Sequence, residues 1–167
     1  MDSTHTDTAA LAAQVQRLLD IEAVRHLIAT YARGADRRND PEIMGPLFSE
    51  DAVWECEGFG HHEGRAAIAA GLAETGRRDI TWTLHYLVSP IVHIGDDARS
   101  GEAHYYLWEL ANMRGGDGAP RACWVGGTYD TQLVKHDERW YFSHMRLNLA
   151  LVAPYDRGWS EGPLQPF

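Results

Sequence analysis

Two residues of types that commonly transfer protons, Asp36 and His85, lie where regular structure can hold them. Asp36 follows Ile28 and Ala32 at four-residue steps, which places it at the edge of the buried face of a helix and near its C-terminal end. The helix dipole disfavours a carboxylate at that end unless a donor or a cation meets it. The simpler alternative is a solvated carboxylate that is offset by the two arginines that follow it.

His85 lies in the segment 82–88, Trp-Thr-Leu-His-Tyr-Leu-Val, which is typical of a strand. Its strand face is shared with Thr83 and Leu87. If that face lines a pocket, the imidazole is enclosed; otherwise His85 is a core histidine with one hydrogen bond. A carboxylate that accepts from one imidazole nitrogen fixes the tautomer and makes the other nitrogen more basic. Asp36 and His85 together would therefore form a general base working near neutral pH.

Arg146 is the third candidate for chemistry. Alternation along the last strand predicts that it shares a face with Trp140, Phe142, His144 and Asn148. An arginine on a largely aromatic face needs an anion, water or an acceptor, and it could stabilise a leaving group or a developing oxyanion. An arginine at the rim of the site, stacked on an aromatic ring, is the alternative. In the preceding strand, Gly126-Gly127 predicts a bulge that curves the sheet.

The elements that must position these residues are helical in the first half of the chain. Over 9–35, apolar residues recur at three- and four-residue steps, as in one face of a helix: Ile21, Val24, Ile28, Tyr31 and Ala35. The stretch 37–41 ends that helix. A short helix over 43–48, a brief strand over 52–56 and a third helix over 63–76 follow. The polar residues 1–8 are expected to be disordered.

The second half contains four long segments rich in Val, Ile, Thr, Tyr and Trp, at 82–94, 98–113, 121–135 and 139–151. The short polar or glycine-containing stretches between them are hairpin signals, so the segments form an antiparallel meander. Three helices packed in a curved antiparallel sheet give an α+β fold, shaped as a cone with a pocket at its open end. The domain covers 9–153, and a C-terminal tail follows at 154–167.

Composition excludes several classes of function. The formal net charge of −9 argues against nucleic acid and anionic membrane surfaces as partners. The longest apolar runs are too short to span a bilayer, and we find no signal peptide. Cys56 and Cys123 lie far apart without CxxC spacing, which favours a reducing cytoplasm. No metal is expected, since the nine histidines form no HExxH or zinc-type cluster, and neither GxGxxG nor a Walker loop suggests a nucleotide cofactor.

Five segments of the chain resemble the SnoaL-like branch of the NTF2-like superfamily. They are Ile-Glu-Ala-Val-Arg-His-Leu-Ile-Ala-Thr-Tyr-Ala-Arg-Gly-Ala-Asp at 21–36, Leu-Phe-Ser-Glu-Asp-Ala-Val-Trp at 47–54, Gly-Arg-Ala-Ala-Ile at 64–68, Leu-His-Tyr at 84–86 and Gly-Gly-Thr-Tyr at 126–129. The resemblance runs from about residue 15 to residue 150 and implies a cystatin-like α+β barrel. Within that branch the chain most resembles the group that includes scytalone dehydratase, hexachlorocyclohexane dehydrochlorinase and bile acid 7α-dehydratase.

This resemblance implies roles for four residues. Members of the group use an aspartate at the end of the first helix and a histidine on the following long strand, and Asp36 and His85 occupy the matching places. Tyr31 matches a tyrosine of the bile acid enzyme, and Arg146 falls close to an active-site arginine on the last strand. All four residues are therefore expected to be catalytic.

The chain departs from the bile acid enzyme at a further acid on the middle strand. Around that position it has Tyr106 or Trp108, while Glu109 is expected to face the opposite way from Tyr106. The aromatic lining implied by Tyr106, Trp108 and Trp124 would suit a flat or cyclic apolar substrate, although the same residues would equally serve as core packing. Tyr129 and His144 complete the expected substrate-binding set.

The predicted function is that of a cofactor-independent lyase in which His85, oriented by Asp36, removes a proton from carbon. An isomerase or polyketide cyclase on the same scaffold, or a non-catalytic ligand-binding module, are the alternatives. The expected partners are a small-molecule substrate and further copies of the chain. The resemblance implies assembly through the outer sheet surface, and a trimer is favoured over a dimer.

Overall fold

The computed structural model describes residues 3–160 and 162–164, with side chains from Thr8 onward. It confirms the predicted α+β fold of three helices and a curved sheet. The elements are α1 (Ser3–Ala35), α2 (Pro41–Met44), the 3-10 helix η1 (Gly45–Leu47), β1 (Phe48–Cys56), β2 (Gly60–Glu63), α3 (Arg65–Arg78), β3 (Ile80–Ile94), β4 (Ser100–Arg114), β5 (Pro120–His136) and β6 (Arg139–Pro154).

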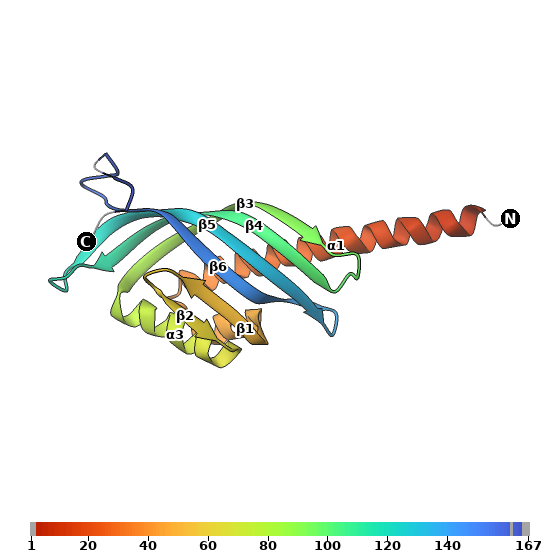
Figure 1. The fold of residues 1–167 in the computed structure, drawn as a ribbon, viewed down its shortest axis with the longest axis horizontal. Helices are drawn as coiled ribbons and strands as arrows, with labels where there is room; N and C mark the ends of the chain where they lie inside the picture. The colour runs from red at the N-terminus through yellow and green to blue at the C-terminus, as the bar shows by residue number, and fades with distance from the viewer. Residues whose placement is uncertain (1–2, 161, 165–167) are drawn as a thin grey trace.

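The four long strands form the predicted antiparallel meander within a six-stranded sheet of order β2-β1-β6-β5-β4-β3. The sheet is not purely antiparallel, because β1 runs parallel to β6. Strand β2 was not expected, since Gly58-Phe59-Gly60 suggested only a break; it pairs with β1 across that turn. Figure 1 shows the sheet curving over α1, with α3 beside the β1–β2 pair and the sheet left open.

Helix α1 supplies one wall of the core through the face that the periodicity predicted. Val24, Ile28, Tyr31 and Ala35 are buried there, and Ile21 packs against them. The helix begins at Ser3 rather than Ala9, so residues 3–8, which were expected to be disordered, are helical. Residues 1 and 2 lie outside the described residues. The first half of α1 projects beyond the sheet (Figure 1). No helix in the described ranges is long and apolar enough to cross a membrane.

A buried polar anchor fixes α1 against the far strands. The Asp20 carboxylate accepts a hydrogen bond from the indole nitrogen of Trp140 at 2.9 Å and pairs with the Lys135 ammonium at 2.9 Å. All three side chains are largely buried, so the charges are compensated inside the protein. This contact holds the helix across the sheet and leaves its C-terminal end, with Asp36, beside β3.

A β-bulge in β6 changes which of its side chains face the core. Leu133 pairs with Phe142, whereas Gln132 pairs with His144, so Ser143 is an extra residue. An extra residue shifts the alternation of side chains by one. The residues from His144 to Leu149 therefore point to the opposite face from the one that simple alternation predicts.

A second register shift lies opposite Gly126 and Gly127, where Ala150 is the extra residue of β6. A Cβ atom on Gly127 would lie 2.3 Å from the carbonyl oxygen of Asn148, so only glycine allows the two backbones to approach this closely. The paired glycines therefore lie at a bulge and a close backbone approach, but the extra residue belongs to β6 rather than to the strand that carries them.

Candidate active site

Asp36 and His85 meet at the end of α1. The Asp36 Oδ1 atom accepts a hydrogen bond from His85 Nδ1 at 2.8 Å and another from the His85 backbone N–H at 2.8 Å. The same oxygen lies 3.5 Å from the Thr83 hydroxyl. These donors stabilise the negative charge of Asp36, which the helix dipole disfavours at the C-terminal end of α1. The contact places the proton of the neutral imidazole on Nδ1 and leaves Nε2 as its basic atom.

A second carboxylate faces the other imidazole nitrogen. Glu109 Oε2 lies 3.4 Å from His85 Nε2, and the side chains of both residues are at least nine-tenths buried. The two residues are direct cross-strand partners of β3 and β4. His85 is therefore held between two acids, with the more exposed Asp36 on one side and the buried Glu109 on the other.

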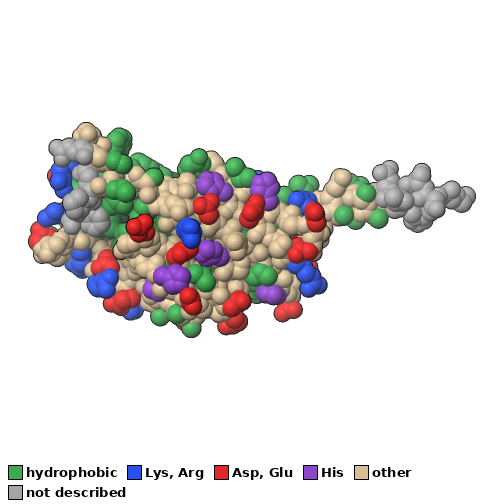
Figure 2. All heavy atoms as spheres, viewed as in Figure 1, with side chains coloured by type: hydrophobic (Ala, Val, Ile, Leu, Met, Phe, Trp, Pro, Cys, Tyr) green, Lys and Arg blue, Asp and Glu red, His purple; other side chains and the backbone are tan. Residues whose placement is uncertain are grey.

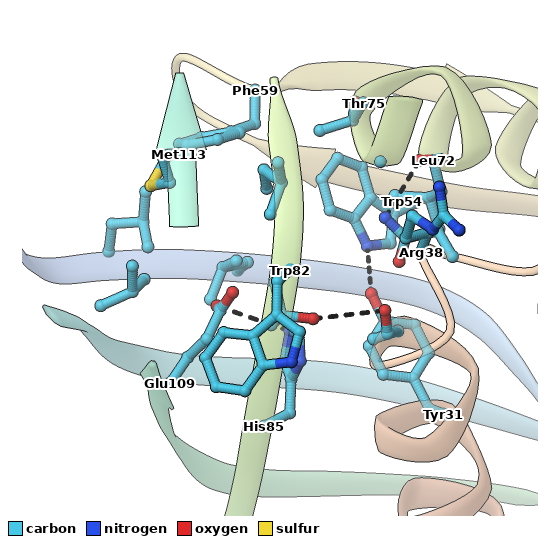
Figure 3. A pocket seen from close by; sticks show the side chains of 18 of the residues that line it. Tyr31, Arg38, Trp54, Phe59, Leu72, Thr75, Trp82, His85, Glu109 and Met113 are labelled. Atoms are coloured by element: carbon cyan, nitrogen blue, oxygen red, sulfur yellow. Dashed lines mark hydrogen bonds and ion pairs between the residues drawn. The ribbon is translucent and has the colours of Figure 1, made fainter. Parts of the chain in front are cut away.

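His85 and Glu109 open onto a cavity enclosed by α1, α3 and the inner face of the sheet (Figure 3). Its volume is about 70 Å³. The wall is mostly apolar and aromatic, formed by Trp54, Phe59, Leu72, Ile80, Trp82, Met113, Val125, Leu147 and Leu149. A small apolar cavity with a few converging polar groups is typical of a small-molecule site.

Tyr31 and Tyr129 both line this cavity, as predicted for Tyr31 and for the binding residue Tyr129. The Tyr31 hydroxyl accepts a hydrogen bond from the Trp54 indole N–H at 3.1 Å and also hydrogen bonds with the Tyr129 hydroxyl. Burial raises the pKa of Tyr31 to about 12, so the phenol keeps its proton. Since the Tyr31 oxygen accepts from Trp54, its own proton is available for the Tyr129 oxygen or for a group in the cavity.

Burial and neighbouring groups change the pKa values of His85 and Glu109. Burial opposes the charged form of His85, but the Glu109 charge and the Asp36 hydrogen bond outweigh it and raise the pKa of His85 above 6.5. Burial also raises the pKa of Glu109 above 4.5; His85 counters this effect and Asp36 adds to it. Since Nε2 and the Glu109 carboxyl group lie 3.4 Å apart, the two groups titrate as a coupled pair.

These raised pKa values predict that stability falls as pH rises. The native state binds more protons than the unfolded chain between each group's ordinary pKa, 4.5 for Glu109 and 6.5 for His85, and its higher pKa in the folded state. Their contribution to stability is fully present below those values and is lost as pH rises through the folded pKa values. We expect the free energy of unfolding, measured with urea from about pH 5 to about pH 8, to fall more steeply in wild type than in Glu109→Gln. Parallel pH dependences in the two proteins would contradict this.

Arg146 and His144 do not reach the cavity, which corrects two predicted site positions. Both side chains bind Glu55 on the opposite face of the sheet, with His144 Nε2 at 2.9 Å and Arg146 Nε at 2.8 Å from Oε1. The reason is the bulge at Ser143, because its extra residue moves the His144 and Arg146 side chains from the inner to the outer face of the sheet. Histidine, acidic and basic side chains mingle near the middle of the face seen in Figure 2.

The predicted aromatic lining is also corrected. Tyr106 and Trp108 lie on the outer face of β4 and are 53% and 37% exposed. Trp124 stacks on Trp108 at 5.4 Å on that same face and contacts Tyr155 and Trp159 of the tail. The cavity is instead lined by aromatic residues from other elements, including Trp54 and Phe59. Residues 161 and 165–167 of the tail lie outside the described residues.

Glu109 is the residue whose role sequence reasoning missed. Its orientation opposite to Tyr106 was predicted correctly, but Tyr106 was taken to face the pocket. A usable signal exists in the alternating residues of β4, because Ala103, Tyr105, Leu107, Ala111 and Met113 form an apolar inner row that Glu109 interrupts. A single acid in such a row must be paired or protonated, and either state is useful in catalysis.

The described residues contain no group of three or more His, Cys, Asp or Glu side chains placed to hold a metal ion. Cys56 and Cys123 are both buried free thiols.

The SnoaL-like domain family matches residues 16–146, so the chain belongs to the SnoaL-like family. No curated protein sequence matches it.

Among solved structures, the hexachlorocyclohexane dehydrochlorinase LinA-type3 from Novosphingobium barchaimii LL02 is 19% identical, with a TM-score of 0.75 over 92% of this chain and 99% of that one. A putative scytalone dehydratase from Novosphingobium aromaticivorans DSM 12444 is 18% identical, with a TM-score of 0.73 over 85% and 91%. A protein of unknown function with a cystatin-like fold from Nostoc punctiforme PCC 73102 is 17% identical, with a TM-score of 0.63 over 78% and 91%. These likenesses confirm the cystatin-like, NTF2-like fold.

Proposed function

We propose that this chain is a cofactor-independent lyase, of dehydratase or dehydrohalogenase type, that acts on a small cyclic and largely apolar substrate. The main support is the arrangement of His85, whose Nδ1 is held by Asp36 while Nε2 lies at the cavity beside Glu109. An imidazole oriented in this way is suited to remove a proton from carbon. The mostly apolar wall accommodates the ring and keeps water away from the reacting atoms.

The reaction begins with neutral His85 taking a proton from a carbon next to a carbonyl or an activated ring. The two electrons of the C–H bond form a carbon–carbon double bond, and the bond to the leaving group breaks. A hydroxide needs a proton to depart as water, and protonated Glu109 or Tyr31 can donate one; a halide leaves without one. Asp36 stabilises the imidazolium that forms and is a positioning residue.

The comparisons support this class of reaction, because the matching structures include a hexachlorocyclohexane dehydrochlorinase and a putative scytalone dehydratase. Each name describes its own protein only. Structural similarity at below 20% identity establishes the fold of this chain and nothing more. The reaction class assigned to this chain rests on its own cavity and its own three ionisable residues.

An isomerase or a polyketide cyclase is the second candidate, favoured by the position of the Glu109 carboxyl group 3.4 Å from His85 Nε2, where either group can hold the abstracted proton. A base that keeps the proton beside the substrate can return it to a different carbon, so that no group is lost. A ligand-binding module without catalysis is the third candidate, in which the same pocket holds a molecule and His85 only hydrogen bonds to it.

Product mass separates these candidates. Wild-type protein is incubated with a panel of hydroxylated and halogenated cyclic compounds, and the products are identified by mass spectrometry, with His85→Ala as the blank. Loss of water or of hydrogen halide supports the lyase. A product of unchanged mass identifies an isomerase or cyclase, and binding without turnover across the panel favours the binding module.

Glu109→Gln tests the role of the second acid. Glutamine keeps the shape but cannot protonate a leaving hydroxide, so we expect kcat/KM for elimination of water to fall by about 10²-fold. Elimination of halide from a substrate that differs only in the leaving group should fall less. Glu102→Gln, on the exposed face of the same strand, is the matched control and should leave both rates unchanged. Equal losses for water and halide would contradict the proposed role of Glu109 as acid.

The homotrimer and the cytoplasmic location stay predictions. Assembly through the outer face of the sheet is supported by exposed Tyr86, Tyr106 and Trp108, which leave aromatic surface open to water.

A further inference from the structure

A cation lies at the wall of the cavity without an acidic partner. Arg38 is the only arginine or lysine among the described residues that line the cavity, and Glu109 is the only carboxylate. None of the ion pairs among the described residues includes Arg38, and its side chain is exposed. Figure 3 shows it beside Leu72 and Trp54, on the other side of the view from Glu109. The cavity therefore has an acidic end and a basic end.

The backbone that presents Arg38 is held in an uncommon conformation. Arg38 and Asn39 have φ angles of 61° and 54°, a region that non-glycine residues rarely adopt. The Asn39 amide donates to the Leu72 carbonyl at 3.0 Å, which ties this turn to α3. The Arg38 carbonyl packs against Gly76, where a Cβ atom would lie 2.5 Å from its oxygen. The neighbouring Arg37 is absent from the cavity wall.

We propose that Arg38 binds an anionic substituent of the substrate, so that the substrate is a small cyclic acid, such as a carboxylic acid, rather than a neutral molecule. This inference rests on the proposed function of the cavity as a substrate site. The carboxylate binds the guanidinium, which offers paired donors to such a group, and the ring extends along the aromatic wall toward His85. The negative charge of Asp36 beside His85 disfavours the reverse orientation, so Arg38 sets which carbon meets Nε2.

The test uses inert acids and their neutral amides, which need no turnover. Benzoate and 2-naphthoate are compared with benzamide and 2-naphthamide by isothermal titration calorimetry at low salt. The wild-type chain is expected to bind at least one acid about 10-fold more tightly than its amide, the low end for a hydrogen bond to a charged group. Arg38→Gln should lose this preference, and Arg38→Lys should keep part of it. Arg37→Gln, which removes the same charge one residue away, should keep all of it.

A wild-type protein that binds neither acid more tightly than its amide overturns the inference. An Arg38→Gln variant that keeps the wild-type preference for the acid over the amide also overturns it. The same holds if Arg37→Gln loses this preference as fully as Arg38→Gln does, because the preference would then depend on net charge alone. The proposed lyase function is tested separately, because it fails when His85 variants keep their turnover, whatever the charge of the ligand.

Discussion

We expect His85→Ala to lower kcat/KM on the true substrate by about 10²- to 10⁴-fold, the range that a positioned general base contributes. The variant removes the only imidazole at the described cavity wall, while the Asp36 carboxylate stays free to accept the backbone N–H of residue 85. Initial rates measure the effect, and circular dichroism with a thermal melt shows whether the variant is folded.

The chain provides a matched control for this substitution on the outer face of the sheet. His104 Nδ1 contacts Asp130 Oδ1 at 2.7 Å, a geometry close to that of the His85–Asp36 pair, but both side chains are far more exposed. His104→Ala should therefore leave kcat/KM near the wild-type value. A folded His85→Ala variant that keeps most of the activity would contradict the proposed mechanism.

Asp36→Asn should lower kcat/KM by a comparable factor, about 10²- to 10⁴-fold, although it only replaces one carboxylate oxygen with an amide nitrogen. Asp36 Oδ1 accepts both the ring and the backbone N–H of His85. An asparagine oxygen in the same place can accept both N–H groups, but it carries no negative charge. It therefore neither makes Nε2 more basic nor stabilises the imidazolium that forms when Nε2 takes the proton.

A pH profile of kcat/KM distinguishes this loss of basicity at His85 from a loss of fold. The variant should bind an inert ligand as wild type does, with the loss confined to turnover and with the profile for the free enzyme altered. Asp130→Asn, at the exposed pair, is the control and should have no effect. An Asp36→Asn variant with near wild-type turnover would show that His85 acts without an orienting carboxylate.

Much of the fold follows from local patterns. Three- and four-residue spacing in α1 identifies its buried face, because a helix that packs on a sheet must bury one stripe of side chains. Alternation and turn residues locate the four long strands to within a few residues, since hairpins need short polar connections. The parallel pairing of β1 with β6 joins segments far apart in the chain, and no local pattern specifies it.

The sequence by itself determined the fold class, the SnoaL-like resemblance and the identity of Asp36 and His85 as a candidate pair. Only the tertiary structure decided that Nδ1 meets the carboxylate, that Glu109 faces Nε2, and that Arg146 and the outer tryptophans lie away from the cavity. The physical reason is that alternation along a strand divides residues between two faces but does not say which face is inside. One bulge at Ser143 then exchanges those faces as far as the second bulge at Ala150, and such a bulge depends on pairing with β5 rather than on the residues of β6 alone. The acid–imidazole pair thus begins as two plausible residues in the sequence and becomes, in the folded chain, a histidine held between two carboxylates.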